Sequence, residues 1–295
     1  MSGVTVPERA AALSPVGNEV LTSLYRHRLL STSQIRAIHC PDGTARGVRK
    51  TLARLAEGGY AERVGVSGSR ETAWFVTPVG AEAVEGSGVT TRAYRMTPER
   101  ARGPLQSHTL AVNDVGIAFL EAARRRGEDF DASGWRHETM HPISEGRKPE
   151  LLIADAVLDY TVHEPDGEVF LCRFVEVDRA TMSVREVAAK LTNYARLYQF
   201  RPKAANGWRQ HYPRFPKVLV VLSGRPVPIL ERRLRSLLEM ARRDAELVTL
   251  VEELGISMTT LDDLKARGPF APIFWRLGGS AGPVDVLGRR RVARP

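Results

Sequence analysis

Cysteine is nearly absent from this sequence of 295 residues, which contains only Cys40 and Cys172. The two lie far apart, and neither is followed by a second cysteine at the spacing of metal ligands. This argues against a disulfide framework of the kind that stabilises small secreted domains, and against a zinc knuckle. We expect two ordinary, half-buried thiols.

Long apolar runs are also missing. No stretch is long enough to span a bilayer, and no signal-peptide pattern follows Met1. We therefore expect a cytoplasmic protein, associated with the nucleoid or with a plasmid and not with a membrane.

Motifs that bind nucleotides or relaxase metals are lacking too. Neither G-x-x-x-x-G-K-[ST] nor G-x-G-x-x-G occurs, which argues against dependence on ATP or a dinucleotide. The histidine-hydrophobe-histidine metal site of the common rolling-circle relaxases is absent among the seven histidines. Tyr194 and Tyr198 are candidate nucleophiles for strand transfer, but their helical spacing with Leu191 and Leu197 favours an apolar stripe.

Positive charge is what the sequence has in excess. Lysine and arginine number 43 against 34 acidic residues, which gives a formal net charge of +9 and an isoelectric point near 9.9. A balance of this kind is typical of proteins that bind polyanions. We expect double-stranded DNA as the partner.

The first part of the chain has the pattern of three short helices followed by a hairpin. Apolar residues recur at helical spacing in residues 19–30, around 35–38 and in 44–57. Strand-like segments at 60–64 and 72–76 flank a glycine- and serine-rich turn. This order predicts a winged helix-turn-helix domain over residues 16–86, after a flexible arm at 1–15 and before a linker at 87–105.

The third helix of this domain combines an apolar stripe with cations, as a recognition helix does. In the major groove such donors contact phosphates and base edges. A solvated charged face, or a module for docking proteins and forming a homodimer, is the alternative. The expected DNA contacts, on this helix and near the wing, are Arg46, Arg49, Lys50, Arg54, Arg63 and Arg70.

The second part of the chain predicts a mixed sheet flanked by helices, over residues 106–277. The pattern is a helix, three strands that form a meander, a helix, a strand and a basic helix. The ranges are 107–126, 130–140, 151–162, 169–177, 184–200, 217–222 and 229–243, with one more strand at 248–252 and a basic flexible tail at 278–295. The whole chain is thus expected to be of the α/β (α+β) class.

Three carboxylates near the shared end of two strands of this second domain are candidates for a site. Asp155 lies in the middle strand of the meander, and Glu176 and Asp178 end the next. Strand alternation directs Glu176 and Asp178 to one face, where Asp155 can meet them. Oxygen ligands in such a cluster suit Mg²⁺ or Mn²⁺, which can activate water and offset charge on a leaving phosphate.

At these residues the chain resembles the PD-(D/E)XK superfamily of restriction-endonuclease-like nucleases. The core of that superfamily has the order helix, three-strand meander, helix and strand, which is the order expected here. The pattern departs from the superfamily at Ala154, where proline is common, and at Asp178, where a lysine is expected. Some members take that lysine from the following helix. The resemblance therefore implies a catalytic set of Asp155, Glu176, Asp178 and Lys190, with Arg179 as the substitute for the lysine.

The segment from Glu176 to Thr181, with Lys190 and Tyr194 after it, resembles the signature of the replication-relaxation family. The resemblance implies a role in plasmid or mobile-element replication or conjugation, alongside other replication or conjugation proteins. Two functions stay open. One is a metal-dependent DNA endonuclease, and the other is a noncatalytic replication or transcription regulator whose acids form ion pairs in a degenerate core.

Two further motifs have plainer interpretations. His137 to His141 spells the zinc-protease pattern H-E-x-x-H, but Pro142 follows directly and the segment falls where a strand is expected. The basic helix at 229–243 offers a second DNA-facing surface or a solvated face. Its cations are Arg232, Arg233 and Arg235, and they are followed by Arg242 and Arg243.

Overall fold

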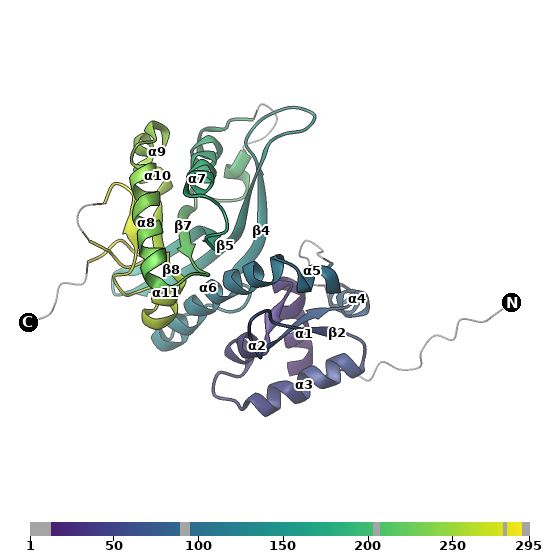
Figure 1. Cartoon of the computed structure of the whole chain (residues 1–295). Coiled ribbons are helices and arrows are strands. Elements are labelled where there is room, and N and C mark those ends of the chain that lie inside the picture. The colour runs from purple at the N-terminus through teal and green to yellow at the C-terminus, as the bar shows by residue number, and fades with distance from the viewer. Residues whose placement is uncertain (1–12, 89–94, 203–206, 280–281, 291–295) are drawn as a thin grey trace, which may run out of the picture. The chain divides into compact units, whose positions relative to one another are not determined.

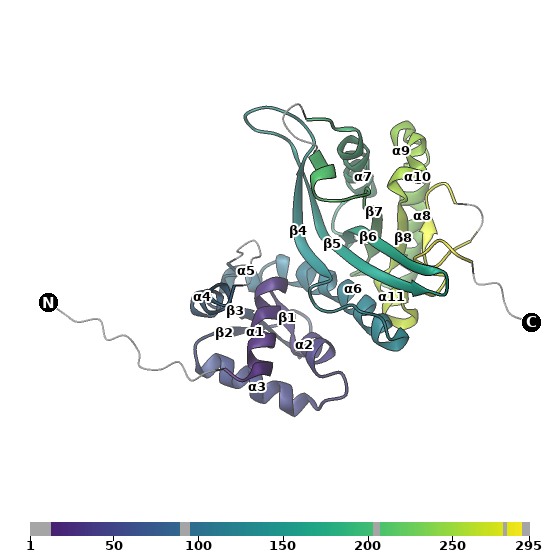
Figure 2. The same cartoon turned by 180° about the vertical axis from the view of Figure 1, so that it is seen from behind.

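The computed structural model describes residues 13–88, 95–202, 207–279 and 282–290. The chain divides into two compact units, residues 1–110 and 111–295. A three-stranded and a six-stranded sheet, together with helices of four to 22 residues, confirm the expected mixed α+β composition (Figures 1 and 2). The arm expected at residues 1–15 falls almost entirely outside the described residues.

The first unit contains the three helices and the hairpin that the sequence predicts. Each of the first three helices is capped by a serine or threonine that accepts from a backbone N–H near the helix start, and α2 has a complete capping box between Ser31 and Gln34. The elements are α1 (Pro15–His27), β1 (Leu30–Ser31), α2 (Thr32–His39), α3 (Ala45–Glu57), β2 (Ala61–Gly65), β3 (Thr72–Val76), α4 (Pro78–Gly86) and α5 (Pro98–Arg102).

The small sheet of this unit has the order β1-β3-β2 and is antiparallel throughout. The two-residue β1 was not expected from the sequence. The helix α3 buries Val48, Leu52 and Leu55, so its remaining faces are turned to solvent. This burial of one stripe fixes which side of α3 is available for contacts.

The stretch expected to be a linker, residues 87–105, differs from that expectation where it is described. Thr97 caps α5, and Met96 and Ala101 are buried against Val64 and Phe75. These apolar side chains give the segment a core to pack on, which an open linker lacks. Residues 89–94 lie outside the described part of the chain.

The second unit is built on a six-stranded sheet of order β4-β5-β6-β7-β8-β9. The strands β4, β5 and β6 form the expected antiparallel meander, β7 and β8 continue parallel to β6, and β9 returns antiparallel. The strands are β4 (Trp135–Pro142), β5 (Leu151–Glu164), β6 (Gly167–Asp178), β7 (Lys217–Leu222), β8 (Ser257–Thr260) and β9 (Trp275–Arg276).

Helices cover both faces of this sheet. Figures 1 and 2 show α7 and α8 side by side on one face, over a core that includes Phe174, Leu191 and Leu234. On the other face α6 packs Phe119 against Tyr160, with ring centroids 5.9 Å apart. The helices are α6 (Leu105–Arg126), α7 (Val184–Gln199), α8 (Val227–Ala241), α9 (Ala245–Thr249), α10 (Val251–Leu254) and α11 (Leu261–Arg267), with a 3-10 turn at Gly207–Gln210.

Glycine is required where α6 crosses β4. A Cβ atom on Gly116 would lie 2.3 Å from the ring of Trp135, closer than carbon atoms approach without displacement.

The prediction of a strand at 248–252 is wrong. This segment forms the end of α9 and the start of α10, and the strand follows as β8. Leu247, Leu250 and Leu254 are buried at helical spacing, which explains the helices.

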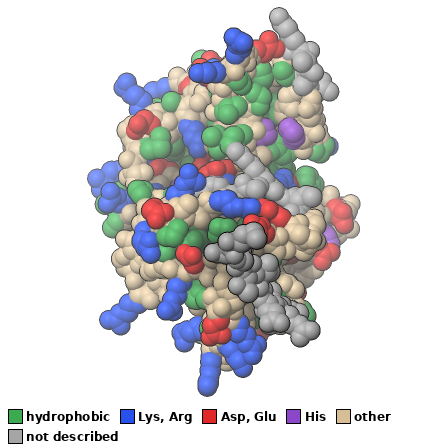
Figure 3. All heavy atoms as spheres, turned by 90° about the vertical axis from the view of Figure 1, so that its right-hand side faces the viewer, with side chains coloured by type: hydrophobic (Ala, Val, Ile, Leu, Met, Phe, Trp, Pro, Cys, Tyr) green, Lys and Arg blue, Asp and Glu red, His purple; other side chains and the backbone are tan. Residues whose placement is uncertain are grey.

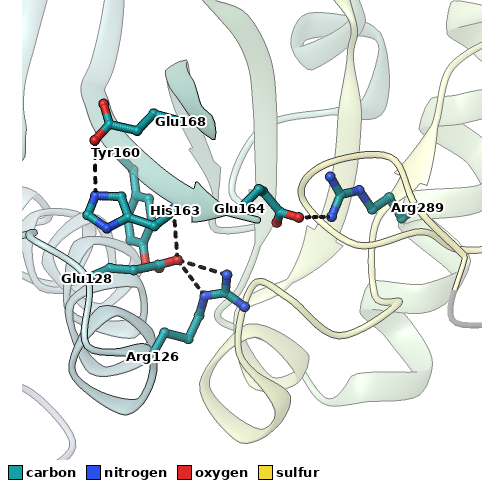
Figure 4. A network of polar contacts seen from close by, with 7 residues as sticks. All are labelled: Arg126, Glu128, Tyr160, His163, Glu164, Glu168 and Arg289. Carbon is teal, nitrogen blue, oxygen red and sulfur yellow. Dashed lines mark hydrogen bonds and ion pairs between the residues drawn. The ribbon is translucent and has the colours of Figure 1, made fainter. Parts of the chain in front are cut away.

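A polar network fastens α6 to β5 at the end of the sheet (Figure 4). The buried carboxylate of Glu128 accepts from the hydroxyl of Tyr160 and, at 2.8 Å, from the guanidinium of Arg126. It also accepts from the backbone N–H of His163 at 3.3 Å. Burial of Glu128 is thus offset by several donors, as a buried carboxylate requires.

The C-terminal segment is not the open tail expected at 278–295, where it is described. Val284 pairs with Phe274, and Val284 and Val286 are both 8% exposed. Arg289 forms an ion pair of 2.9 Å with Glu164 on β5 (Figure 4). The two valines supply the apolar burial that a purely basic tail would lack, and this holds the segment on the domain.

The H-E-x-x-H motif lies on β4 and not on a helix. The pairing of β4 with β5 joins His137 to Ala156 and Thr139 to Ala154, and Glu138 between them has φ of 43°. His137 and His141 are about 13 Å apart along an extended strand, too far to bind one metal ion. The interpretation of this motif as a chance match is therefore supported.

Candidate functional site

Two of the expected carboxylates meet between neighbouring strands. Ala156 on β5 pairs with Val175 on β6, so the preceding Asp155 lies beside the following Glu176. Both lie at the face of the sheet that α7 covers. Lys190 comes from the second turn of α7, where the apolar positions Val187 and Leu191 orient the helix on the core.

Lys190 joins the two carboxylates. Its Nζ forms an ion pair with Oε2 of Glu176 and lies 3.4 Å from Oδ1 of Asp155. The side chains of Asp155 and Lys190 are 16% and 32% exposed, whereas that of Glu176 is 6% exposed. The group is therefore open to solvent on the side of Asp155 and Lys190 and closed behind Glu176.

The buried position of Glu176 changes the proton affinities of the group. Burial, followed by the repulsion of Asp155, raises the pKa of Glu176 to about 8, although Lys190 and Tyr194 act in the opposite direction. For Lys190 burial lowers the pKa, but attraction to Glu176 and Asp155 outweighs it, and the pKa is raised. A cation next to these two carboxylates therefore stabilises their ionised forms.

Each carboxylate is also held by a second donor. Oδ2 of Asp155 accepts from the backbone N–H of Val177 at 2.8 Å, and Oε1 of Glu176 accepts from the hydroxyl of Tyr194. The ring of Tyr194 packs against Phe174 with centroids 5.3 Å apart. These contacts fix the orientation of both acids and leave Oδ1 of Asp155 and Oε2 of Glu176 facing Lys190.

Tyr194 thus has a role that its apolar spacing did not predict. Burial and the neighbouring Glu176 raise its pKa well above the ordinary value, so its hydroxyl keeps its proton. A fully buried, protonated hydroxyl is a poor nucleophile. The contact with Glu176 could have been suspected only from the pairing of a buried acid with a tyrosine on the following helix.

Asp178 has a different partner from the one expected. Its Oδ1 accepts from Nη2 of Arg233 at 3.1 Å and from the backbone N–H of Ala180 at 2.9 Å, and Nε of Arg233 also donates to Oδ2. Arg233 further donates to the carbonyl oxygen of Met182 at 2.7 Å. Within the described residues, no group of three or more His, Cys, Asp or Glu residues could hold a metal ion. The structure therefore gathers Asp155, Glu176 and Lys190, and directs Asp178 to α8.

The expected DNA contacts of the first unit are on its surface. Thr44 caps α3, and the four cations of α3 are exposed, away from its buried stripe. None of them forms an ion pair with a described residue. Figure 3 shows Lys and Arg side chains projecting at the lower end of the view, where Figure 1 places α3. The four cations are Arg46, Arg49, Lys50 and Arg54, and the hairpin adds the exposed Arg63 and Arg70.

No described helix has the length and apolar character needed to cross a membrane. No curated protein and no solved structure matches this chain.

The sequence model of one protein family, described as replication-relaxation, does match, over residues 21–209. The matched range begins in α1 and ends in the 3-10 turn after α7, so it contains α3 and the group of Asp155, Glu176 and Lys190. It covers well over half of the 295 residues. The chain belongs to the replication-relaxation family.

Proposed function

We propose that this protein binds duplex DNA through α3 and cleaves a phosphodiester bond at Asp155, Glu176 and Lys190, during replication or conjugation of a plasmid or other mobile element. Membership of the replication-relaxation family supports the setting. The observation that carries the chemistry is the position of Lys190 beside two carboxylates from adjacent strands.

The first unit fits a winged helix-turn-helix domain, with α3 as its recognition helix and the β2–β3 hairpin as its wing. The exposed cations of α3 have no carboxylate partner among the described residues, so they can neutralise phosphates without first breaking an ion pair. The start of α3 carries Arg46, Arg49 and Lys50, and in helix-turn-helix proteins this end contacts base edges.

The donor chemistry of the second unit fits Mg²⁺ or Mn²⁺. Mg²⁺ keeps several water ligands and takes only one or two protein carboxylates, and Asp155 and Glu176 provide two. When bound, the ion would supply a Lewis acid for the phosphoryl oxygens. Asp155 and Glu176 are the residues that would hold it, through carboxylate oxygens that now contact Lys190.

The residues of the chain itself have separate tasks in this proposal. Lys190 places a positive charge where the phosphate gains charge in the transition state, a task that a compact ammonium suits. Tyr194 and the N–H of Val177 keep the two acids in position. Asp178 has a structural task, because its oxygens accept from Arg233 on α8 and from the backbone N–H of Ala180.

A noncatalytic regulator is the second candidate, and one observation favours it. Lys190 already compensates the charge of Glu176 and Asp155, as an ion-pair network in a degenerate core would. Such a protein would bind a chosen DNA sequence without divalent metal. Other replication or conjugation proteins and a second copy of the chain remain predicted partners.

Cleavage of supercoiled and linear plasmid DNA with Mg²⁺ or Mn²⁺ separates the two candidates. We expect nicking or cutting by the wild type, and none by Glu176→Gln, which keeps the shape of the side chain. Glu231→Gln, an exposed acid on α8, is the matched control and should cut as the wild type does. Metal-independent DNA binding without any cleavage would favour the regulator.

A further inference from the structure

Four arginines lie on segments that meet at one edge of the second unit. The strands β6 and β7 are parallel, with Asp178 opposite Leu222, so the loops that follow them leave the sheet at the same edge. Arg179 follows β6 directly, Arg185 is the second residue of α7, Arg225 lies in the β7–α8 loop and Arg232 is on α8. These four residues are called here the arginine cluster.

The backbone of this edge is firmly held. Asp178, Arg233 and the carbonyl of Met182 tie β6, α8 and the β6–α7 loop together. Gly224, with φ of 77°, lies so close to Arg179 that a Cβ atom would be 3.0 Å from its carbonyl oxygen. The loops that carry Arg179 and Arg225 are therefore in contact.

The charge of the cluster is not balanced within the described residues. Arg185, Arg225 and Arg232 are exposed, Arg179 is partly exposed, and none of the four forms an ion pair with a described carboxylate. Nearby, Asp178 is already paired with Arg233, and Glu186 accepts from the backbone N–H of Ser183 in a capping box. Some arginines elsewhere in this unit do face carboxylates, namely Arg126, Arg136, Arg196, Arg267, Arg276 and Arg289.

The surroundings of the cluster add to its positive potential. The helices α7 and α8, of 16 and 15 residues, both begin at this edge, and their amino-terminal ends carry partial positive charge. Glu176 precedes Asp178 by two residues on β6, which is about 7 Å along a strand. A polyanion held by the cluster would therefore lie beside the candidate site.

We propose that the arginine cluster is a second nucleic-acid surface, which holds the phosphate backbone of DNA next to Glu176 and Lys190. The inference rests on the proposed function for the identity of its ligand, but it assigns residues that α3 and the carboxylate group do not include. Arginine suits this role because its guanidinium presents paired donors to phosphate oxygens. Arg233, expected from sequence to face DNA, is part of the scaffold instead.

Salt dependence of DNA affinity tests the cluster in the full chain. Binding of a fluorescent duplex is measured by anisotropy in EDTA at several salt concentrations, for the wild type and for Arg179→Gln/Arg225→Gln/Arg232→Gln. Each phosphate contact contributes about 0.9 to the slope of log K against log salt. We expect the slope of this variant to become shallower by about 2 to 3, with weaker binding at every salt concentration.

The matched control is Arg201→Gln/Arg209→Gln/Arg214→Gln, which removes the same charge from exposed positions between α7 and the start of β7, at the other end of that strand. Its slope should equal that of the wild type. If the cluster variant and the control have equal slopes, the inference is overturned.

A variant of α3, with Arg46, Arg49, Lys50 and Arg54 changed to glutamine, separates this inference from the proposed function. Loss of binding in the α3 variant alone would leave the proposed DNA-binding role intact and remove the cluster from it. Loss in the cluster variant alone would support the cluster and contradict the role of α3.

Discussion

Lys190 on α7 forms an ion pair with Glu176 on β6, although Glu176 is almost entirely buried. Burying a carboxylate is costly unless a cation and hydrogen bonds compensate for it. The ion pair with Lys190 and the hydroxyl of Tyr194 provide this compensation. The group of Asp155, Glu176 and Lys190 is thus a candidate site whose buried carboxylate also costs stability when a partner is lost. Cleavage assays and the free energy of unfolding measure these two properties separately.

Replacing Lys190 with methionine should destabilise the protein. The change leaves Glu176 buried without its cation, and loss of one partner of a buried pair costs about 3 kcal/mol. Urea denaturation at pH 9, where Glu176 with its pKa of about 8 is ionised in the wild type, measures the free energy of unfolding. Lys148→Met, at an exposed position in the β4–β5 loop, should change it little. Adding Glu176→Gln to Lys190→Met should recover much of the loss, and no recovery would contradict this account.

Removing the hydroxyl of Tyr194 should have a smaller effect. Tyr194→Phe keeps the ring against Phe174 but takes away one buried hydrogen bond to Glu176, which is worth about 1 kcal/mol. If the site is catalytic, cleavage should slow without being abolished, since Tyr194 positions Glu176 and does not touch the phosphate. The comparison is Tyr198→Phe, whose ring packs on Trp208 and Phe215. Equal effects of the two changes would argue against a positioning role.

His141 should make stability depend on pH in the acid range. Burial, followed by repulsion from His211, lowers the pKa of His141 from 6.5 to about 4. Between these values the unfolded chain binds a proton that the folded chain does not, so stability is full above pH 6.5 and falls as the pH drops toward 4. The loss amounts to about 3 kcal/mol at 1.36 kcal/mol per pKa unit.

This dependence can be read from urea denaturation at pH 7.5, 5.5 and 4.5. His141→Gln should flatten the difference between these pH values relative to the wild type, whatever its effect at pH 7.5. The neighbours of His141 are His211, Tyr212 and Phe174, so no facing carboxylate among them opposes the shift. An unchanged pH dependence in the variant would mean that other groups cause it.

The C-terminal segment should contribute through its valines more than through its charge. Val286→Asp places a carboxylate at a buried position, and we expect a loss of about 2 kcal/mol or more in unfolding free energy. Arg289→Ala breaks an ion pair whose arginine is 55% exposed, and such surface pairs contribute less than about 1 kcal/mol. The ratio of the two losses, measured by thermal or urea denaturation, checks the assignment. Equal losses would contradict it.

Local patterns predicted much of this structure. Helical spacing predicted a helix over residues 44–57, which the structure has as α3 with Thr44 as its cap, and strand alternation predicted that Asp155 can meet Glu176. Lys190 was expected from the resemblance to the nuclease superfamily, some members of which take their lysine from the helix after the acidic strand, and the structure brings it to both acids. These features depend on residues close in sequence or on one strand pairing.

Contacts between distant segments were harder to predict. Asp178 shares a strand with Glu176, but its partner Arg233 comes from α8, and no spacing rule links the two. The burial of Val284 and Val286 depends on a surface that exists only once the sheet has formed. Only two residues form β1, and a strand this short has no periodicity in sequence from which it could be predicted.

The two borders of the large sheet have a consequence for behaviour at high concentration. At one border β9 has only two residues, and at the other the backbone of Glu138 leaves the extended conformation in the middle of β4. A long, regular outer strand is a template on which another chain can add its own strand, and both interruptions shorten that template. Copies of the protein at high concentration therefore have little regular outer strand through which their sheets can join into an aggregate.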